Sequence, residues 1–120
     1  MIQARSLASN LTSYSLSEQD TGCTWTDGKK IYRKTIAFAS LSNSSSVSAR
    51  HNISGLAEII KITGISCQSN NRWRILNMPA GNDSGQWTIV EVDTTTVYVY
   101  SGNNQTNQSA KVTLYYTKTV

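Results

Sequence analysis

Residues 110–117 read A-K-V-T-L-Y-Y-T, and they indicate the fold more clearly than any other stretch of the chain. Ala110, Val112, Leu114 and Tyr116 alternate there with residues that are mostly polar. Successive side chains of a β-strand point to opposite faces of the sheet. This period of two therefore predicts a strand with one buried face.

The chain before residue 110 carries similar signals several times. Strands are expected at 30–40, 47–53, 56–66, 72–76, 86–92 and 95–101, and a loop is expected at 79–85. The pair Asp27-Gly28 is a strong hairpin signal in front of the first of these strands. Short strands separated by frequent turns, without a segment of helical period, predict an all-β fold. We expect an antiparallel β-sandwich of about seven to eight short strands.

Composition supports this class. The chain has 120 residues and a mass of 13.2 kDa, which suits one domain. It contains 17 Ser, 14 Thr and 10 Asn, and these residues favour turns and strand surfaces over helices. Three Trp, six Tyr and a net charge of only +4 argue against disorder. Residues 1–13 are polar and unpatterned, so we expect a linker there and a folded domain over residues 14–120.

The charge distribution and the apolar pattern exclude several partners. Basic residues are scattered except at Lys29, Lys30, Arg33 and Lys34, so we do not expect nucleic-acid binding. No apolar run approaches the roughly 20 residues that span a bilayer, and we expect no membrane insertion and no signal peptide. The two cysteines, Cys23 and Cys67, match no zinc or redox spacing, and free thiols are the simpler expectation.

The residues that enzymes need are sparse. His51 is the only histidine, and no catalytic motif surrounds it, so a structural role is expected. No two of the seven carboxylates form a convincing pair for glycoside hydrolysis. The chain also has no phosphate-binding glycine loop and no clustered metal ligands. We therefore expect neither an enzyme nor a cofactor.

Sugar binding fits the sequence better. Proteins bind the apolar faces of sugars with aromatic rings and the hydroxyl groups with amide or guanidinium groups. The candidate ligand contacts are Asn71, Arg72, Trp73, Trp87, Tyr98 and Asn104, which lie in or beside expected loops. Each aromatic residue could instead belong to the core or to a subunit interface, and Trp25 is expected to be structural.

The two ends of the chain resemble a known family. Residues 14–18 and 25–35 fit the pattern Y-S-x-x-E … W-x-D-G-K-x-I-Y-x-K-T, and residues 112–119 fit V-x-L-x-Y-T-K-T. Residues 51–53 fit a shorter H-x-I pattern between them. These segments resemble the C-terminal tip domain of bacteriophage tail-fibre and receptor-binding proteins. Residues 66–110 carry no matching motif, and Cys23-Thr24 departs from the expected link before Trp25.

The resemblance implies a homotrimeric β-sandwich at the distal end of a virion fibre, with residues 1–13 as the end of the shaft. It implies attachment to a bacterial surface receptor, often a polysaccharide. The motif residues Tyr14, Trp25 and Tyr32 would then serve the core or the trimer interface. Two other functions remain open: a structural module that trimerises or caps a fibre, and a free carbohydrate-binding module.

Overall fold

A computed structural model describes residues 14–76 and 87–119, and these residues contain eight strands and no helix. The strands are β1 (Gln19–Thr24), β2 (Lys30–Phe38), β3 (Ser46–Arg50), β4 (Leu56–Cys67), β5 (Trp73–Ile75), β6 (Thr88–Val92), β7 (Thr96–Ser101) and β8 (Ser109–Lys118). The predicted all-β, sandwich-like fold is confirmed, with strand ends that differ from the predicted ones by a few residues. The expected loop at 79–85 lies outside the described residues.

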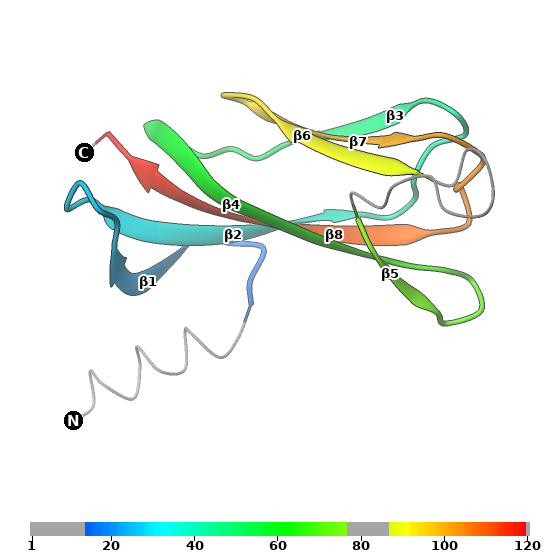
Figure 1. Cartoon of the computed structure of the whole chain (residues 1–120), viewed down its shortest axis with the longest axis horizontal. Helices are drawn as coiled ribbons and strands as arrows, with labels where there is room; N and C mark the ends of the chain where they lie inside the picture. Colours follow the sequence, from blue (N-terminus) through cyan, green and yellow to red (C-terminus); the bar gives the residue numbers. More distant parts are fainter. Residues whose placement is uncertain (1–13, 77–86, 120) are drawn as a thin grey trace. The chain divides into compact units, whose positions relative to one another are not determined.

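The strands form two antiparallel sheets (Figure 1). One sheet has five strands in the order β1-β2-β8-β4-β5, and the other has three in the order β3-β7-β6. By its contacts the chain divides into two compact units. The described part of unit 1 is 14–35, 53–62 and 113–119, and that of unit 2 is 36–52, 63–76 and 87–112. Strands β2, β4 and β8 contribute residues to both units.

In unit 1, the Asp27-Gly28 pair forms the hairpin that the sequence predicts. The Trp25 N–H donates to the Lys29 carbonyl at 2.8 Å, and Gly28 adopts a φ of 85°. This left-handed backbone favours glycine because it has no Cβ. The Asp27 carboxylate accepts from the Lys29 N–H at 3.0 Å and closes the turn between β1 and β2.

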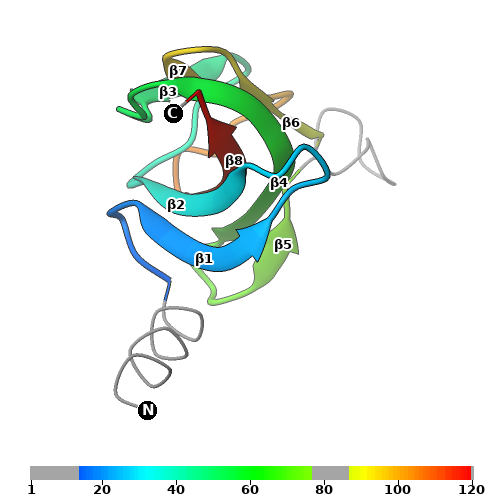
Figure 2. The same ribbon diagram turned by 90° about the vertical axis from the view of Figure 1, so that its left-hand side faces the viewer.

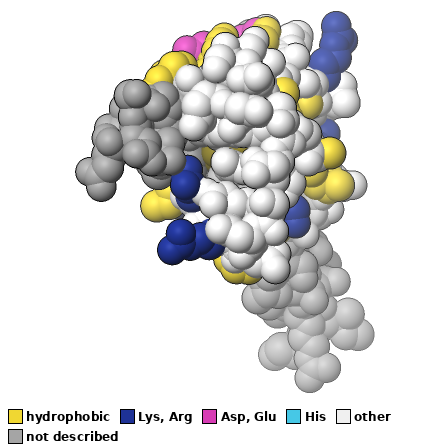
Figure 3. Space-filling view, turned by 90° about the vertical axis from the view of Figure 1, so that its right-hand side faces the viewer, with side chains coloured by type: hydrophobic (Ala, Val, Ile, Leu, Met, Phe, Trp, Pro, Cys, Tyr) yellow, Lys and Arg dark blue, Asp and Glu magenta, His cyan; other side chains and the backbone are white. Residues whose placement is uncertain are grey.

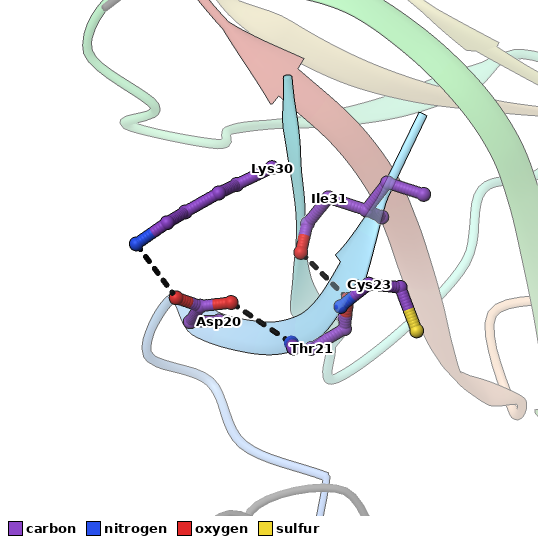
Figure 4. Close-up of polar contacts among 6 residues, drawn as sticks. Asp20, Thr21, Cys23, Lys30 and Ile31 are labelled. Atoms are coloured by element: carbon purple, nitrogen blue, oxygen red, sulfur yellow. Dashed lines mark hydrogen bonds and ion pairs between the residues drawn. The ribbon is translucent and has the colours of Figure 1, made fainter. Parts of the chain in front are cut away.

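Strand β1 is the one that periodicity does not reveal, because a bulge interrupts it. Its register with β2 shifts between Asp20 and Thr24, and Gly22 has a φ of 78°. Figure 4 shows how side chains hold the bulge: Asp20 accepts from the Gly22 N–H at 2.9 Å and contacts Lys30 at 3.5 Å. Thr21 donates to the Ile31 carbonyl at 2.7 Å. Residues 21–23 therefore lie opposite the single residue Ile31 as a bulge in an edge strand.

In unit 2, the three-stranded sheet lies over the part of the five-stranded sheet that belongs to the same unit, as Figures 1 and 2 both show. Its central strand β7 alternates between fully buried Val97 and Val99 and half-buried Tyr98 and Tyr100. The buried side chains of β7 join those of the second layer to form the core of this unit. The other members of that core are Ile36, Phe38, Leu41, Leu76, Val90, Ala110 and Val112.

Candidate functional site

The hairpin loop between β4 and β5 is closed by hydrogen bonds among its own residues. The Gln68 N–H donates to the Arg72 carbonyl at 2.8 Å, and the Asn71 N–H donates to the Gln68 carbonyl at 3.0 Å. Asn71 has a φ of 61°, a conformation that asparagine tolerates better than most residues, and Asn70 accepts from the Arg72 N–H at 3.2 Å. Because the backbone closes on itself, the exposed side chains of Asn71 and Arg72 are available to a ligand.

Large apolar side chains gather beside this loop. Trp73 pairs with Cys67 and Ile75 pairs with Ile65, so these four residues share one face of the hairpin. Trp73 is 68% exposed, Ile75 75% and Ile65 53%. We call Ile65, Cys67, Trp73 and Ile75 the β4–β5 face. The opposite side of the hairpin is covered, since Ser66 of β4 is buried.

The loop between β7 and β8 lies next to the same hairpin loop. Asn107 donates from Nδ2 to the Ser69 hydroxyl at 3.4 Å, which brings the two loops together within unit 2. Asn104 is exposed, and its Oδ1 accepts from the Thr106 N–H at 3.1 Å. Asn43 forms an isolated bridge with Asn104, so a third loop joins them. We call the loops 40–45, 68–72 and 102–108 the loop end of unit 2.

Uncharged polar side chains dominate the loop end of unit 2. Figure 3 looks toward the side of the molecule on which these loops are drawn, and its centre is neither hydrophobic nor charged. The loop end thus presents amides and hydroxyls with Arg72 and Trp73 at one side. Amide, guanidinium and indole groups of this kind bind the hydroxyls and the apolar faces of sugars.

Trp87 directly precedes β6 in the chain and lies beside the start of the β7–β8 loop. It is half-buried, and its carbonyl accepts from the Gly102 N–H at 3.1 Å. The chain immediately before it, residues 77–86, lies outside the described residues. The structure therefore places Trp87 beside the loop end of unit 2, together with Asn71, Arg72, Trp73 and Asn104.

Tyr98 occupies a different surface from the other candidates. It lies in the central strand of the three-stranded sheet, opposite Ser48 and Glu91, and it stacks on Tyr100 with ring centroids 6.3 Å apart. Its hydroxyl donates to Asp93 Oδ2 at 3.0 Å. The hydrogen bond to this carboxylate raises the pKa of Tyr98 above its usual value. Tyr98 and Tyr100 thus form a second candidate surface with a polar edge.

Asp93 organises the turn that leads to Tyr98. Its Oδ1 accepts from the Thr95 N–H at 2.9 Å and from the Thr96 N–H at 2.7 Å. These backbone hydrogen bonds lower the pKa of Asp93. The buried His51 also contacts this turn. Its ring Nε2 lies 3.0 Å from the Asp93 carbonyl oxygen, and its backbone N–H donates to the Thr95 carbonyl at 3.0 Å. The expected structural role of His51 agrees with these contacts.

The residues of the two terminal motifs meet in unit 1, a connection that sequence analysis did not predict. Glu18 accepts from the Tyr116 hydroxyl at 2.7 Å and from Lys118 at 3.0 Å. The hydroxyls of Tyr14 and Tyr115 lie 3.0 Å apart and share a hydrogen bond.

Charged groups also contact the aromatic rings of these motifs. The Arg33 guanidinium lies 4.0 Å from the centre of the Tyr14 ring, and Tyr32 stacks on Tyr116 at 6.1 Å. Cations over aromatic faces and stacked rings both stabilise a fold. Burial, reinforced by the Glu18 hydrogen bond, raises the pKa of the Tyr116 phenol. These contacts identify the motifs as parts that hold unit 1 together.

The described residues were also compared with the requirements of metal sites and of membrane-spanning helices. They contain no group of three or more His, Cys, Asp or Glu side chains that could hold a metal ion. They also contain no helix with the length and apolar character needed to cross a membrane. Cys23 is exposed, Cys67 is half-buried, and both are free thiols.

Comparison with known proteins finds no family model, curated sequence or solved structure that matches the chain.

Proposed function

We propose that this chain is the receptor-binding tip domain of a bacteriophage tail fibre and that it attaches to polysaccharide on a bacterial surface. The loop end of unit 2 is the observation that carries the proposal. It combines the exposed side chains of Asn71, Arg72, Trp73 and Asn104 on loops that close at the ends of strands. Loops at one end of a β-sandwich can change without disturbing the strands, which suits a recognition surface.

The position of the sequence motifs supports this division of roles. Most motif residues of the phage resemblance, at 14–35 and 113–119, belong to unit 1. The described residues between 66 and 110, which match no motif, belong to unit 2. A framework that does not share its residues with the binding loops is the arrangement expected of a receptor-binding domain, because the loops can then change without loss of the fold.

The side chains at the loop end can bind a sugar without any cofactor. The indole of Trp73 offers a flat apolar face to a pyranose ring. Asn71 and Arg72 can donate hydrogen bonds to hydroxyl or carboxylate oxygens of the same residue or its neighbour. The Asn104 Oδ1 is bonded to Thr106, so its amide nitrogen is the group that would donate to the ligand.

Self-association belongs to the same proposal. Tyr14 and Leu16 of unit 1 are 60% and 61% exposed, and large apolar side chains at this exposure suit contact with another subunit or with the preceding fibre shaft. In a homotrimer, three weak sugar sites act together and bind a repetitive surface far more tightly than one site does. The proposal therefore puts the domain at the distal end of the fibre in the virion, where it can reach a cell surface.

The proposal is tested with the fluorescently labelled chain and a panel of bacterial strains. Binding is measured by flow cytometry before and after mild periodate oxidation, which cleaves vicinal diols of surface glycans. We expect at least one strain to bind the chain and oxidation to abolish that binding. Binding that survives oxidation would contradict a polysaccharide receptor. A chain that has three times the monomer mass but binds no strain would instead support a fibre-capping module.

A further inference from the structure

We propose that the β4–β5 face, with the basic residues around it, binds an anionic lipid surface. This inference goes beyond the proposed function, because it concerns a ligand other than a glycan and adds Ile65 and Ile75, which the glycan site does not use, although Trp73 and Arg72 belong to both surfaces. It rests on three observations: the exposed apolar area, the distribution of charge in unit 2, and the types of side chain on the face.

The exposed area is large for a monomer but small for a subunit interface. Ile65, Trp73 and Ile75 are each more than half exposed on one face. Together they expose on the order of 400 Å² of apolar surface, about half of what each partner of a stable dimer buries. A second copy of the chain on this face alone would therefore bind weakly, whereas a lipid surface needs only a few inserted side chains.

Charge favours an anionic partner. Segment 63–76 contains Arg72 and Arg74 and no acidic residue. Lys111 of β8 is also exposed, and the carboxylates in the described part of unit 2 are Glu91 and Asp93, both in the β6–β7 hairpin of the other sheet. On the face that Figure 3 shows, acidic side chains lie only at the top margin, whereas Lys and Arg lie at the upper right and also lower on the face.

This distribution also argues against face-to-face contact between two copies. Such a contact would bring like charges together around a small apolar area, and like charges repel. A bilayer that contains anionic phosphate groups attracts the same residues, at about 1 kcal/mol for each Lys or Arg near its surface.

The side chains suit the boundary between headgroups and acyl chains. Tryptophan is enriched at this depth because its indole has both an apolar body and a polar N–H. Ile65 and Ile75 have no flat face for a sugar ring, but they gain free energy when they leave water for acyl chains. The exposed Arg72 lies directly before Trp73, where it can reach the phosphate layer while the indole inserts.

The test measures co-sedimentation of the full chain with two kinds of vesicle. One contains mixed phosphatidylglycerol and phosphatidylcholine, and the other contains phosphatidylcholine alone. We expect binding to the mixed vesicles only, and a loss of binding at high salt. Ile75→Ser is expected to lower the partition coefficient by about tenfold or more, and Arg72→Gln by about fivefold.

Matched controls lie on the other sheet. Ile89 is 45% exposed in β6 and Arg50 is exposed in β3, so Ile89→Ser and Arg50→Gln make the same chemical changes away from the proposed face. We expect both to bind like the unmodified chain. Equal losses in the controls, or equal binding to vesicles without phosphatidylglycerol, would overturn the proposal.

A third outcome would reassign the face. If Ile75→Ser converts an oligomer to a monomer in size-exclusion chromatography and the unmodified chain binds no vesicles, a second copy covers the face and the lipid proposal is wrong. Because the vesicles carry no polysaccharide, these results are independent of the cell-binding test of the proposed function.

Discussion

The two compact units use their aromatic residues in different ways. In unit 1 the tyrosines bond to charged and aromatic side chains: Tyr116 to Glu18, Tyr14 to Arg33 and Tyr115. In unit 2, Trp73 stands exposed at the end of a self-contained hairpin loop. The sequence alone therefore does not separate these aromatic residues by role. Their contacts in the structure distinguish a residue that stabilises the fold from one whose side chain can bind a partner.

The largest effect is expected in the core of unit 1. Tyr116 is fully buried and stacks on Tyr32, so Tyr116→Ala removes its packing and its hydrogen bond together. We expect the free energy of unfolding to fall by about 3–5 kcal/mol. Urea denaturation followed by tryptophan fluorescence measures it. A loss of unfolding free energy as small as that for an exposed residue would show that Tyr116 does not stabilise unit 1.

A smaller effect at alkaline pH tests the hydroxyl of the same residue. Burial raises the pKa of the Tyr116 phenol, so its contribution to stability is complete below the unfolded value near 10 and is lost as the pH rises above it. Tyr116→Phe is expected to cost about 1 kcal/mol at neutral pH.

The same variant should also lose less stability than the unmodified chain between about pH 9 and pH 11. Tyr98 and Tyr115 also have raised pKa values, so the alkaline loss should shrink and not disappear. Thermal unfolding across this range checks it, and parallel curves for both proteins would contradict the assignment.

Unit 2 is expected to show the opposite pH dependence through Asp93. The Thr95 and Thr96 N–H groups lower the pKa of this carboxylate, so its contribution is present above the unfolded value near 4 and is lost as the pH falls through the folded value. Asp93→Asn should therefore flatten the acid limb of a plot of thermal midpoint against pH. Identical acid limbs would show that the β6–β7 turn does not depend on the charge.

The smallest effect on stability is expected at Trp73. Its side chain is mostly exposed, so Trp73→Ala should change the free energy of unfolding by less than about 0.5 kcal/mol. Urea denaturation of this variant, measured in parallel with Tyr116→Ala, gives the comparison directly. A loss above about 2 kcal/mol would mean that the indole packs against the unit and is a poor candidate for ligand binding.

Strand periodicity predicted much of the fold. Residues 110–117 form the predicted strand, and Val112, Leu114 and Tyr116 are buried as expected. The prediction of a single buried face was wrong for the second half of the strand, because Thr113 and Thr117 on the other face are buried as well. Strand β1 was missed because Gly22 and its bulge break the alternation. The pair of terminal motifs was visible, but their hydrogen bonds across about a hundred residues depend on strand pairing that a local pattern does not encode.

The candidate site was only partly predictable for a related reason. Asn71, Arg72 and Trp73 are adjacent in the sequence, so their proximity was certain, whereas the approach of Asn104 requires the contact between Asn107 and Ser69. The alternation of a three-residue strand is too short to show which side of Trp73 is covered. The turn at Asp93-Thr94 is one that the sequence does predict, because aspartate commonly accepts hydrogen bonds from the backbone N–H groups that follow it, as Asp93 does from Thr95 and Thr96.

The most direct test of the account is the binding of two matched tryptophan variants to a bacterial strain that the chain recognises. Trp73 lies at the proposed recognition surface of unit 2, and Trp25 lies in the β1–β2 hairpin of unit 1 at 37% exposure. The account predicts that Trp73→Ala weakens binding by about tenfold or more, while Trp25→Ala binds like the unmodified chain. Unchanged binding of a folded Trp73→Ala chain would contradict it.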